Sequence, residues 1–294
     1  MSDPLDALRA PTIPMAPDAL FAARLRRRLE LELLHAGDER PEREDAMTDA
    51  LLRDRPSRNG TRHGDVSYIT LAVPDAAIGR RFYGRVLGWT FGTGQLESEG
   101  NQVDSVIPQV GLWPGPAWRG GVSAGAILSW RVDDVAAAAE TVRATGGTAT
   151  EPEQLPYGLQ TECTDGQGLR FWLHQLPPAG EPAGASGERH GDISYLVLRV
   201  ADLEQARRLF SSVLGWTFAP GNVGVHVEGP VPMTGMSEGS PGVVICFRVD
   251  DISVAAERVA NAGGQAGAVE SRPYGLESLC VDDQGVEFYL HQLA

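Results

Sequence analysis

The sequence predicts an α+β protein built from two tandem copies of one domain, and three observations support this prediction. Residues 62–68, Arg-His-Gly-Asp-Val-Ser-Tyr, return as residues 189–195, Arg-His-Gly-Asp-Ile-Ser-Tyr. Further matches within residues 133–176 recur within residues 250–293. Each copy also shows the order strand, helix and several strands twice. Because a repeat of about 110 residues is far longer than a solenoid or propeller repeat, we expect each copy to be a domain with its own core.

The repeat and the Pro- and Gly-rich segments divide the 294-residue chain into four parts. These are an N-terminal extension (1–62), a first domain (63–176), a linker (177–188) and a second domain (189–294). Within the extension, residues 18–35 are expected to form an amphipathic helix that Asp18 caps. This helix either packs on the domains or frays, or it docks a protein partner. The charged residues after it are expected to form a flexible linker.

Composition restricts the partners and the compartment. The chain carries 39 acidic and 25 basic residues, and this net negative charge argues against binding to nucleic acid or to anionic membranes. Its first residues have no basic and apolar signal, and no stretch approaches the ~18 apolar residues of a membrane helix. We therefore expect a cytoplasmic protein. The three cysteines have no CxxC spacing, which favours buried thiols over disulfides or structural zinc.

Capping residues and apolar periodicity define the elements of each copy. The first copy is expected to contain strands at 68–73, from 89, at 126–132, near 160–164 and near 169–173. Asp75 caps its first helix, which Gly88 ends, and Asp134 caps its second helix, which Gly146 and Gly147 stop. The corresponding elements of the second copy are expected at 195–200, 202–214, 243–249, 251–262 and 286–290.

Alternation along the strands predicts which side chains lie on the open face of each sheet, the face away from the helices. Successive side chains of a strand point to opposite faces, so with Ile69, Leu71 and Val73 toward the helix, the residues between them are on the open face. Curled sheets enclose cavities, and we expect open-face residues to bind a ligand. The candidates are Tyr68, Arg170, Trp172 and His174 in the first copy, and Tyr195, Arg199, Glu287, Tyr289 and His291 in the second. Packing of one copy on the other is the alternative for these positions.

Four of the six histidines occur as repeat pairs. His63 and His190 precede a first strand, where they either form hydrogen bonds or rebuild a metal site. His174 and His291 lie near the sheet edge, either exposed or hydrogen-bonded, or in contact with a ligand as proton-transfer groups. His35 and His226 have no counterpart and receive no role.

A set of short motifs carries a resemblance to a known superfamily. In the first copy the motifs are Val73-Pro74-Asp75, Phe82-Tyr83, Leu87-Gly88-Trp89, Val132-Asp133-Asp134, Gly146-Gly147 and Asp165-Gly166-Gln167-Gly168. Together with their counterparts in the second copy, they resemble the vicinal oxygen chelate superfamily, which includes glyoxalase I, extradiol dioxygenases and bleomycin-resistance proteins. The resemblance covers residues 63–294. It implies that each copy has two βαβββ modules and that paired modules form a curled mixed sheet with a concave cavity. The sequence leaves open whether the two modules of a sheet come from the same copy.

The resemblance also implies where a metal would be held, and this sequence departs from the pattern there. Enzymes of the superfamily commonly bind a divalent metal through His, Gln or Glu on the first, fifth and last strands. The matching positions here are Tyr68, Ile127 and Trp172 in the first copy, and Tyr195, Val244 and Tyr289 in the second. None of these is an ordinary ligand. We therefore expect no metal and no other cofactor.

These expectations lead to two functional hypotheses. The first is metal-independent binding of a small aromatic or conjugated molecule in a concave cavity, with Arg170 or Arg199 offering a cation to an acidic group. The second is a metal-free isomerase, cyclase or lyase of a small-molecule or natural-product pathway. In that case His174, His291, Tyr68 or Tyr195 transfers a proton. The sequence leaves open whether there is catalysis and which of the two cavities is used.

Overall fold

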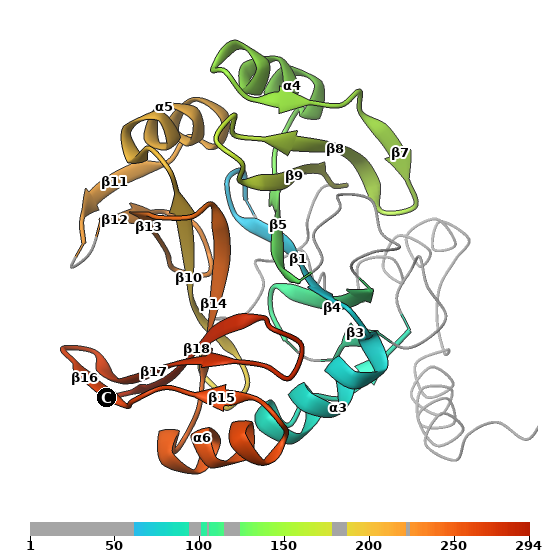
Figure 1. Cartoon of the computed structure of the whole chain (residues 1–294). Coiled ribbons are helices and arrows are strands. Elements are labelled where there is room, and N and C mark those ends of the chain that lie inside the picture. Colours follow the sequence, from blue (N-terminus) through green and yellow to red (C-terminus); the bar gives the residue numbers. More distant parts are fainter. Residues whose placement is uncertain (1–61, 94–100, 105, 115–123, 178–186, 222–223) are drawn as a thin grey trace, which may run out of the picture. The chain divides into compact units, whose positions relative to one another are not determined.

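The computed structural model describes residues 62–93, 101–104, 106–114, 124–177, 187–221 and 224–294 (Figure 1). The predicted helix over 18–35, the rest of the extension up to residue 61 and most of the predicted 177–188 linker lie outside these residues. Among the described residues, no helix is both long and apolar enough to cross a membrane.

The first copy forms a nine-stranded mixed sheet. Its elements are β1 (Val66–Val73), α3 (Ala76–Leu87), β2 (Phe91–Gly92), β3 (Gln102–Val103), β4 (Gln109–Pro114), β5 (Gly125–Arg131), α4 (Val135–Ala144), β6 (Thr148–Ala149), β7 (Glu153–Leu155), β8 (Gly158–Thr164) and β9 (Arg170–Gln175). The strand order is β2-β3-β4-β1-β5-β9-β8-β6, and β7 pairs with β8. Strand β1 is antiparallel to β5 and so joins the two modules at the centre of the sheet.

The second copy repeats this arrangement in a sheet of its own. Its elements are β10 (Ile193–Val200), α5 (Leu203–Leu214), β11 (Thr217–Pro220), β12 (Val225–Glu228), β13 (Thr234–Glu238), β14 (Gly242–Arg248), α6 (Ile252–Asn261), β15 (Gln265–Ala266), β16 (Glu270–Arg272), β17 (Gly275–Val281) and β18 (Glu287–Leu293). Their order, β11-β12-β13-β10-β14-β18-β17-β15 with β16 on β17, matches the first sheet. The predicted α+β fold with two modules per sheet is confirmed, and both modules of a sheet come from the same copy.

The caps predicted from the sequence set where the helices begin. The Asp75 carboxylate accepts hydrogen bonds from the backbone N–H groups of Ala77 and Ile78, and Asp134 caps α4 in the same way. Gly88 ends α3 with a φ of 70°, in the left-handed region that glycine favours. Helix α4 ends one residue before the predicted glycine stop, because Thr145 closes its last turn.

The two copies share one hydrophobic core, so the expectation of a separate core in each copy is wrong. Buried side chains of both copies form a continuous cluster. Trp130 of β5 packs on Phe210 of α5 and on Trp216, with ring centroids 5.1 and 5.4 Å away. On the other side of the interface between the copies, which we call the seam, Phe247 of β14 packs on Tyr83 of α3. Each copy's first helix therefore covers part of the other copy's sheet.

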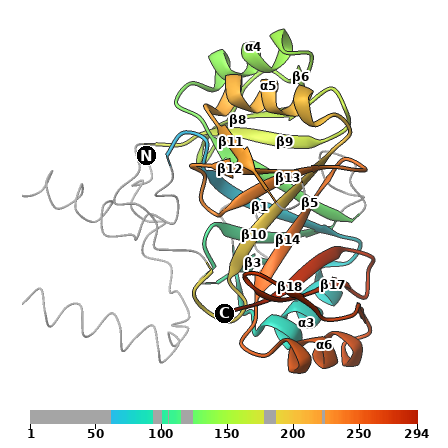
Figure 2. The ribbon, with the colours of Figure 1, turned by 90° about the vertical axis from the view of Figure 1, so that its left-hand side faces the viewer.

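The views in Figures 1 and 2 show the helices paired across the copies. Helices α4 and α5 lie together at one end of the two sheets, and α3 and α6 lie together at the other end. Strands β5 and β14 also lie next to each other. The inner faces of the two sheets therefore pack against helices and against each other, and the open faces point away from this core.

The repeated Arg-His-Gly-Asp and Leu-Gly-Trp motifs meet at this seam. The indole N–H of Trp89 donates to the carbonyl of Gly191 at 2.8 Å, and the Trp216 indole donates to Gly64 at 2.9 Å. Both glycines have a positive φ, and a Cβ on Gly64 would lie 2.6 Å from the Leu214 carbonyl oxygen. Only glycine allows the backbone to come this close to the other copy, so the repeated motifs form contacts between the copies.

The paired histidines and glutamines also form hydrogen bonds across the seam. His63 accepts the backbone N–H of Asp133 at Nδ1 (3.2 Å) and donates from Nε2 to the Val213 carbonyl of the other copy (3.1 Å). The hydrogen-bonding interpretation of His63, just before the first strand, is confirmed, and His190 makes the equivalent contacts. The Gln284 side chain bonds the backbone N–H and carbonyl of Asp75 at the start of α3.

We predict that Trp89→Phe lowers the free energy of unfolding by about 1–2 kcal/mol, because the Gly191 carbonyl then lacks its donor at a buried seam. Urea denaturation measures this change. Trp113→Phe is the matched control, since the Trp113 indole donates to Tyr68 within the first copy. Equal losses of stability in the two variants would contradict a special role for the seam.

Candidate functional site

The three positions at which the superfamily resemblance would place metal ligands lie together on the open face of the first sheet. Tyr68 on β1 is opposite Ser129 on β5, and Ser129 is in register with Trp172 on β9. Ile127, two residues before Ser129, shares this face. Ile127 and Trp172 are buried, yet both lie outside the shared core. Their side chains form part of the floor of a cavity.

This cavity has a volume of about 300 Å³ and lies over the β5, β9, β8 and β6 part of the first sheet. Its lining residues are Ile127, Thr148, Ala149, Thr150, Glu162, Cys163, Thr164, Arg170 and Trp172. Two sequence-predicted ligand contacts, Arg170 and Trp172, are therefore brought together here. The lining combines one aromatic side chain, several hydroxyl groups and one side chain of each charge.

The charged candidates of the two sheets differ in their pairing. Within the described part of the chain, no hydrogen bond or ion pair engages the Arg170 guanidinium. In the second sheet, Glu287 occupies the position equivalent to Arg170 and binds Arg199 at 2.7 Å. Arg199 is thus neutralised by a neighbour, whereas Arg170 stands in the cavity wall as a cation that an acidic ligand can pair with.

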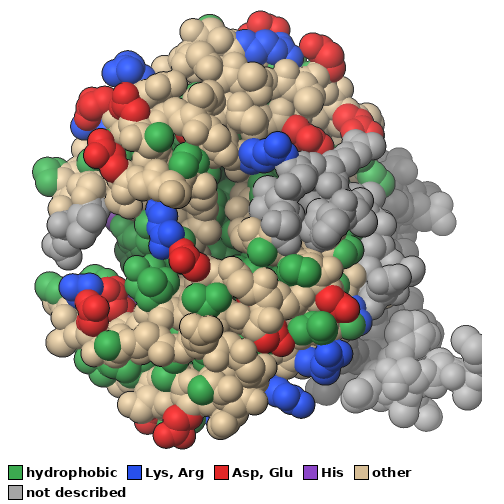
Figure 3. Space-filling view, in the orientation of Figure 1, with side chains coloured by type: hydrophobic (Ala, Val, Ile, Leu, Met, Phe, Trp, Pro, Cys, Tyr) green, Lys and Arg blue, Asp and Glu red, His purple; other side chains and the backbone are tan. Residues whose placement is uncertain are grey.

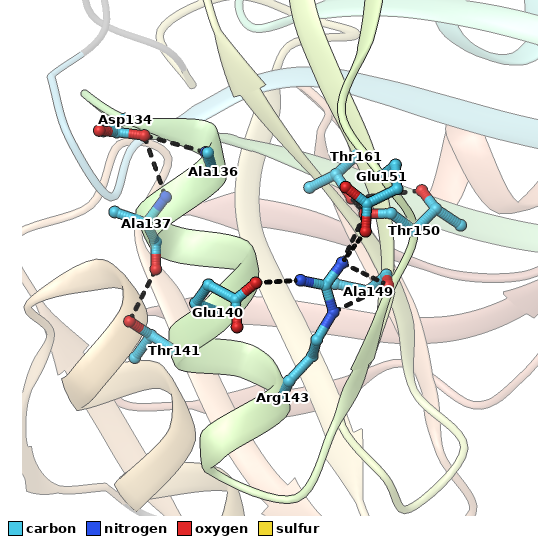
Figure 4. A network of polar contacts seen from close by, with 10 residues as sticks. All are labelled: Asp134, Ala136, Ala137, Glu140, Thr141, Arg143, Ala149, Thr150, Glu151 and Thr161. Carbon is cyan, nitrogen blue, oxygen red and sulfur yellow. Dashed lines mark hydrogen bonds and ion pairs between the residues drawn. The ribbon is translucent and has the colours of Figure 1, made fainter.

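Arg143 on α4 holds one wall of the cavity in place (Figure 4). Its guanidinium donates to the carbonyls of Ala149 and Thr150 at 3.0 and 3.1 Å, and it pairs with Glu140 and Glu151 at 2.6 and 3.1 Å. These hydrogen bonds fix the backbone of Ala149 and Thr150. Since both residues line the cavity, Arg143 stabilises this wall. The second copy has Ala260 at the position of Arg143 and therefore lacks this anchor.

Tyr68 lies across the β3–β4 side of the same open face. Its hydroxyl donates to Gln102 Oε1 at 3.1 Å, and the Gln102 amide donates to the Val110 carbonyl at 2.7 Å. The Tyr68 hydroxyl fills the space that a side chain on Gly111 would need, so glycine at that position makes room for the phenol. Tyr68 is thus a positioned neutral donor next to the cavity floor.

His174 is buried under this face rather than at an exposed rim. Its Nε2 donates to Gln160 Oε1 at 2.8 Å, and Ser67 Oγ lies 3.1 Å from Nδ1. The Tyr157 hydroxyl also donates to Gln160, so the histidine belongs to a closed hydrogen-bond network. Burial lowers the pKa of His174 to about 3, and the imidazole is neutral at pH 7.

The second sheet has its own polar network on the open face. His291 is buried with Ser194 Oγ 3.1 Å from Nδ1 and Glu277 Oε2 3.8 Å from Nε2. Burial lowers the pKa of His291 to about 4, against the opposing effect of Glu277. Burial alone would raise the pKa of Glu277, but hydrogen bonds from Tyr274 and Arg272 outweigh it and lower that pKa.

Tyr195, the counterpart of Tyr68, is paired with a histidine. Its hydroxyl lies 3.3 Å from His226 Nδ1, and the two rings are stacked with centroids 6.2 Å apart. Burial raises the pKa of Tyr195 to about 12. Figure 3 shows a hollow lined by hydrophobic side chains between the part that carries β11–β13 and the part that carries β16 and β17. The second open face is therefore hollowed as well.

Several residues of these networks were missed by sequence reasoning. They are Gln102, Glu162, Gln160, His226 and Glu277. Gln102 lies on β3, which has two residues, and His226 lies on β12, which has four; neither strand shows a periodic pattern long enough to assign a face. Gln160 begins the strand predicted near 160–164 and Glu162 lies within it, and alternation from Trp172 across to β8 would have placed both on the open face.

The side chains at the metal positions do not fit a divalent cation. Tyr68, Ile127 and Trp172 offer one phenol and no imidazole or carboxylate, and Val244 and Tyr289 are no better in the second sheet. Over the described ranges, no group of three or more His, Cys, Asp or Glu side chains could hold a metal ion. The Cys163, Cys246 and Cys280 thiols are all free and buried, as expected.

Comparison with known proteins places this arrangement in a fold class. No protein-family model matches the chain, and no curated protein matches its sequence. Solved structures do match. The Mn(II)-bound glyoxalase from Novosphingobium aromaticivorans is 19% identical, with a TM-score of 0.56 over 78% of this chain and 83% of its own.

Two dioxygenases match in the same way. Homoprotocatechuate 2,3-dioxygenase from Brevibacterium fuscum, in complex with 3,4-dihydroxyphenylacetate, is 16% identical, with a TM-score of 0.57 over 82% of this chain and 84% of its own. The 2,2',3-trihydroxybiphenyl 1,2-dioxygenase from Sphingomonas wittichii is 15% identical, with a TM-score of 0.52 over 78% of this chain and 91% of its own. The chain thus has the vicinal oxygen chelate fold, which confirms the resemblance at the level of the fold. At this identity the likeness defines the architecture alone.

We predict that Arg143→Ala loosens the cavity wall. Amide hydrogen exchange over residues 148–152 should become about tenfold faster, because the carbonyls of this segment lose charge-assisted hydrogen bonds. The equivalent segment 265–269 of the second copy is the internal control and should not change. Unchanged exchange over 148–152 would show that Arg143 does not fix the wall.

We predict that the buried histidines make the fold sensitive to acid. Their folded-state pKa values, about 3 for His174 and about 4 for His291, lie below the usual value near 6.5, so only the unfolded chain takes up these protons as the pH falls from 6.5. The stability that each provides is full above pH 6.5. Between pH 6 and pH 4 it should decline by about 1 kcal/mol per pH unit for each histidine.

Urea-unfolding free energies measured from pH 7 to pH 4 check this decline. The double variant His174→Gln, His291→Gln should show a flatter profile over this range. If both proteins lose stability equally between pH 6 and pH 4, other groups cause the acid sensitivity.

Proposed function

We propose that the first copy binds a small planar organic anion in its cavity without a metal. The observation that carries this proposal is the Arg170 guanidinium, which no described residue pairs with, beside the Trp172 ring in a cavity of about 300 Å³. An unpaired cation in a cavity wall favours a ligand with a carboxylate or phenolate. At the equivalent position of the second copy, Glu287 is paired with Arg199 and offers no cation to such a ligand.

The shape and lining of the cavity favour a flat ligand of modest size. Trp172 and Ile127 give an apolar surface against which a ring can stack, and aromatic stacking adds about 0.5–1.5 kcal/mol beyond area burial. A volume of about 300 Å³ is at the small end of the range for ligand sites, which suits one or two rings with small substituents. Hydroxyl groups of Thr148, Thr150 and Thr164 can orient polar substituents.

Metal independence is part of the proposal. A cation would need imidazole or carboxylate groups where the first sheet has Tyr68, Ile127 and Trp172. These side chains instead make a surface suited to an organic ring. The dioxygenase of the same fold that was solved with 3,4-dihydroxyphenylacetate supports an aromatic acid as the first class of ligand to test. In the proposed function, affinity comes from shape, stacking and one ion pair.

We predict that 2-naphthoate binds saturably and quenches Trp fluorescence, and that the uncharged 2-naphthamide binds more weakly. Arg170→Gln should weaken naphthoate binding about tenfold, which corresponds to about 1.4 kcal/mol for one partly exposed ion pair. Glu287→Gln, the matched change in the second sheet, should have no effect. A metal chelator should leave the affinity unchanged.

Two results would refute the proposal. One is the absence of saturable binding by planar acids together with an unchanged response in Trp172→Ala. The other is a stoichiometric transition metal in protein purified without chelators, combined with loss of binding when that metal is removed.

A further inference from the structure

The two open faces are built from the same positions but differ in the partners of their tyrosines. In the first sheet, the Tyr68 hydroxyl donates to Gln102 on β3. In the second sheet, Tyr195 takes the place of Tyr68, and His226 on β12 takes the place of Gln102. The strand registers confirm the equivalence, because Gln102 is opposite Gly111 and His226 is opposite Gly235.

The same change occurs at the buried histidines. His174 of the first sheet is bonded to Gln160, and His291 of the second sheet faces Glu277. An amide neither gains nor loses a proton near neutral pH, whereas imidazole and carboxylate groups do. Both substitutions therefore replace an inert partner by one that can exchange protons, and both occur on the second sheet.

From this contrast we propose that the open face of the second sheet is a separate acid–base site for neutral, enolisable carbonyl compounds. Tyr195 is the group that exchanges a proton with the substrate, and His226 accepts and returns the proton of Tyr195. This activity lies beyond the binding proposed for the first sheet and needs neither its cavity nor Arg170.

The charges around the site specify the class of substrate. Arg199 is paired with Glu287 at 2.7 Å, and Arg272 donates to Glu277 at 2.6 Å. Both of these cations are thus neutralised by carboxylates, and the Arg248 guanidinium, in register with His291 on the same face, donates to the Gly187 carbonyl. The hollow in Figure 3 is lined mainly by hydrophobic side chains, which suits an apolar molecule with an uncharged oxygen.

The strand register places a second phenol, that of Tyr289, on the same face as Tyr195 and two strands away from it. Cys246 on β14 lies in register with Tyr195 on one side and with Tyr289 on the other. The two tyrosines are therefore two strand spacings apart, about 10 Å between their backbones, with the buried Cys246 thiol between them. Burial raises the pKa of Tyr289, so its hydroxyl stays protonated and can donate to a carbonyl oxygen.

The chemical step conserves atoms and electrons with these groups alone. The substrate C–H bond next to the carbonyl breaks, and its proton passes to the Tyr195 oxygen as the Tyr195 proton moves to Nδ1 of His226. The C–H electron pair forms the C=C bond of the enolate, and the carbonyl π pair moves to the oxygen, which accepts a hydrogen bond from Tyr289. Return of the proton by the reverse route to the same carbon gives exchange. Return to another carbon of a conjugated ketone gives an isomer.

The test is deuterium exchange into 2-tetralone, a neutral aromatic ketone, in D₂O with the full chain, followed by proton NMR. The protein should accelerate exchange at the carbon next to the carbonyl. Tyr195→Phe and His226→Gln should each slow the protein-dependent rate about 100-fold, the lower range for acid–base catalysis. His226→Gln recreates the first sheet's arrangement at Gln102. Tyr157→Phe, which removes a hydroxyl that donates to Gln160 in the first copy, is the control and should exchange at the wild-type rate.

A pH profile separates proton transfer from simple positioning. The dependence of the rate on pH should differ between wild type and His226→Gln, because the amide that replaces the imidazole cannot accept the Tyr195 proton. Urea midpoints confirm that the variants are folded. Exchange no faster than in buffer, or equal rates in wild type, Tyr195→Phe and His226→Gln, would overturn the proposal. Either result leaves the naphthoate test of the first sheet unaffected.

Discussion

The seam between the two copies is the constraint on which the rest of the molecule depends. Trp89 and Trp216 each donate an indole N–H to a glycine carbonyl of the opposite copy, at 2.8 and 2.9 Å. Both carbonyls are reached only because Gly64 and Gly191 lack side chains. The rings around these bonds, among them Trp130 and Phe247, complete the core from both sides. Since each first helix covers part of the other sheet, neither copy encloses its own apolar surface.

This dependence explains why the repeat is nearly identical in some places and divergent in others. Inner-face and seam residues must satisfy the same packing and hydrogen bonds in both halves of a pseudo-symmetric structure. Open-face residues carry no such obligation. Arg170 of the first copy corresponds to Glu287 of the second, and Gln160 corresponds to Glu277. The repeated motifs are thus structural, and the residues that distinguish the two proposed sites, Arg170 and His226, lie at positions where the copies differ.

The sequence predicted what depends on local periodicity and capping. Asp75 and Asp134 begin the helices, and alternation correctly assigned Tyr68 and Trp172 to the open face. It could not give contacts between residues far apart in the chain, such as Trp89 with Gly191. The partner of Tyr195 was also out of reach, because His226 lies on a short strand without a clear pattern. The repeat itself held the missing signal. Residues that are identical in the two copies include the seam contacts, whereas open-face residues that differ between the copies mark the candidate sites.

The cap that Gln284 places on the start of α3 has a consequence for biosynthesis. This glutamine follows Asp75 by 209 residues in the chain, and Phe288, which packs on Phe82 of the same helix, is added later still. During translation at about 5–20 residues per second, the aromatic side of α3 therefore stays uncovered for roughly ten seconds or more after it emerges. Apolar surface that is exposed for this long during synthesis favours aggregation of the nascent chain.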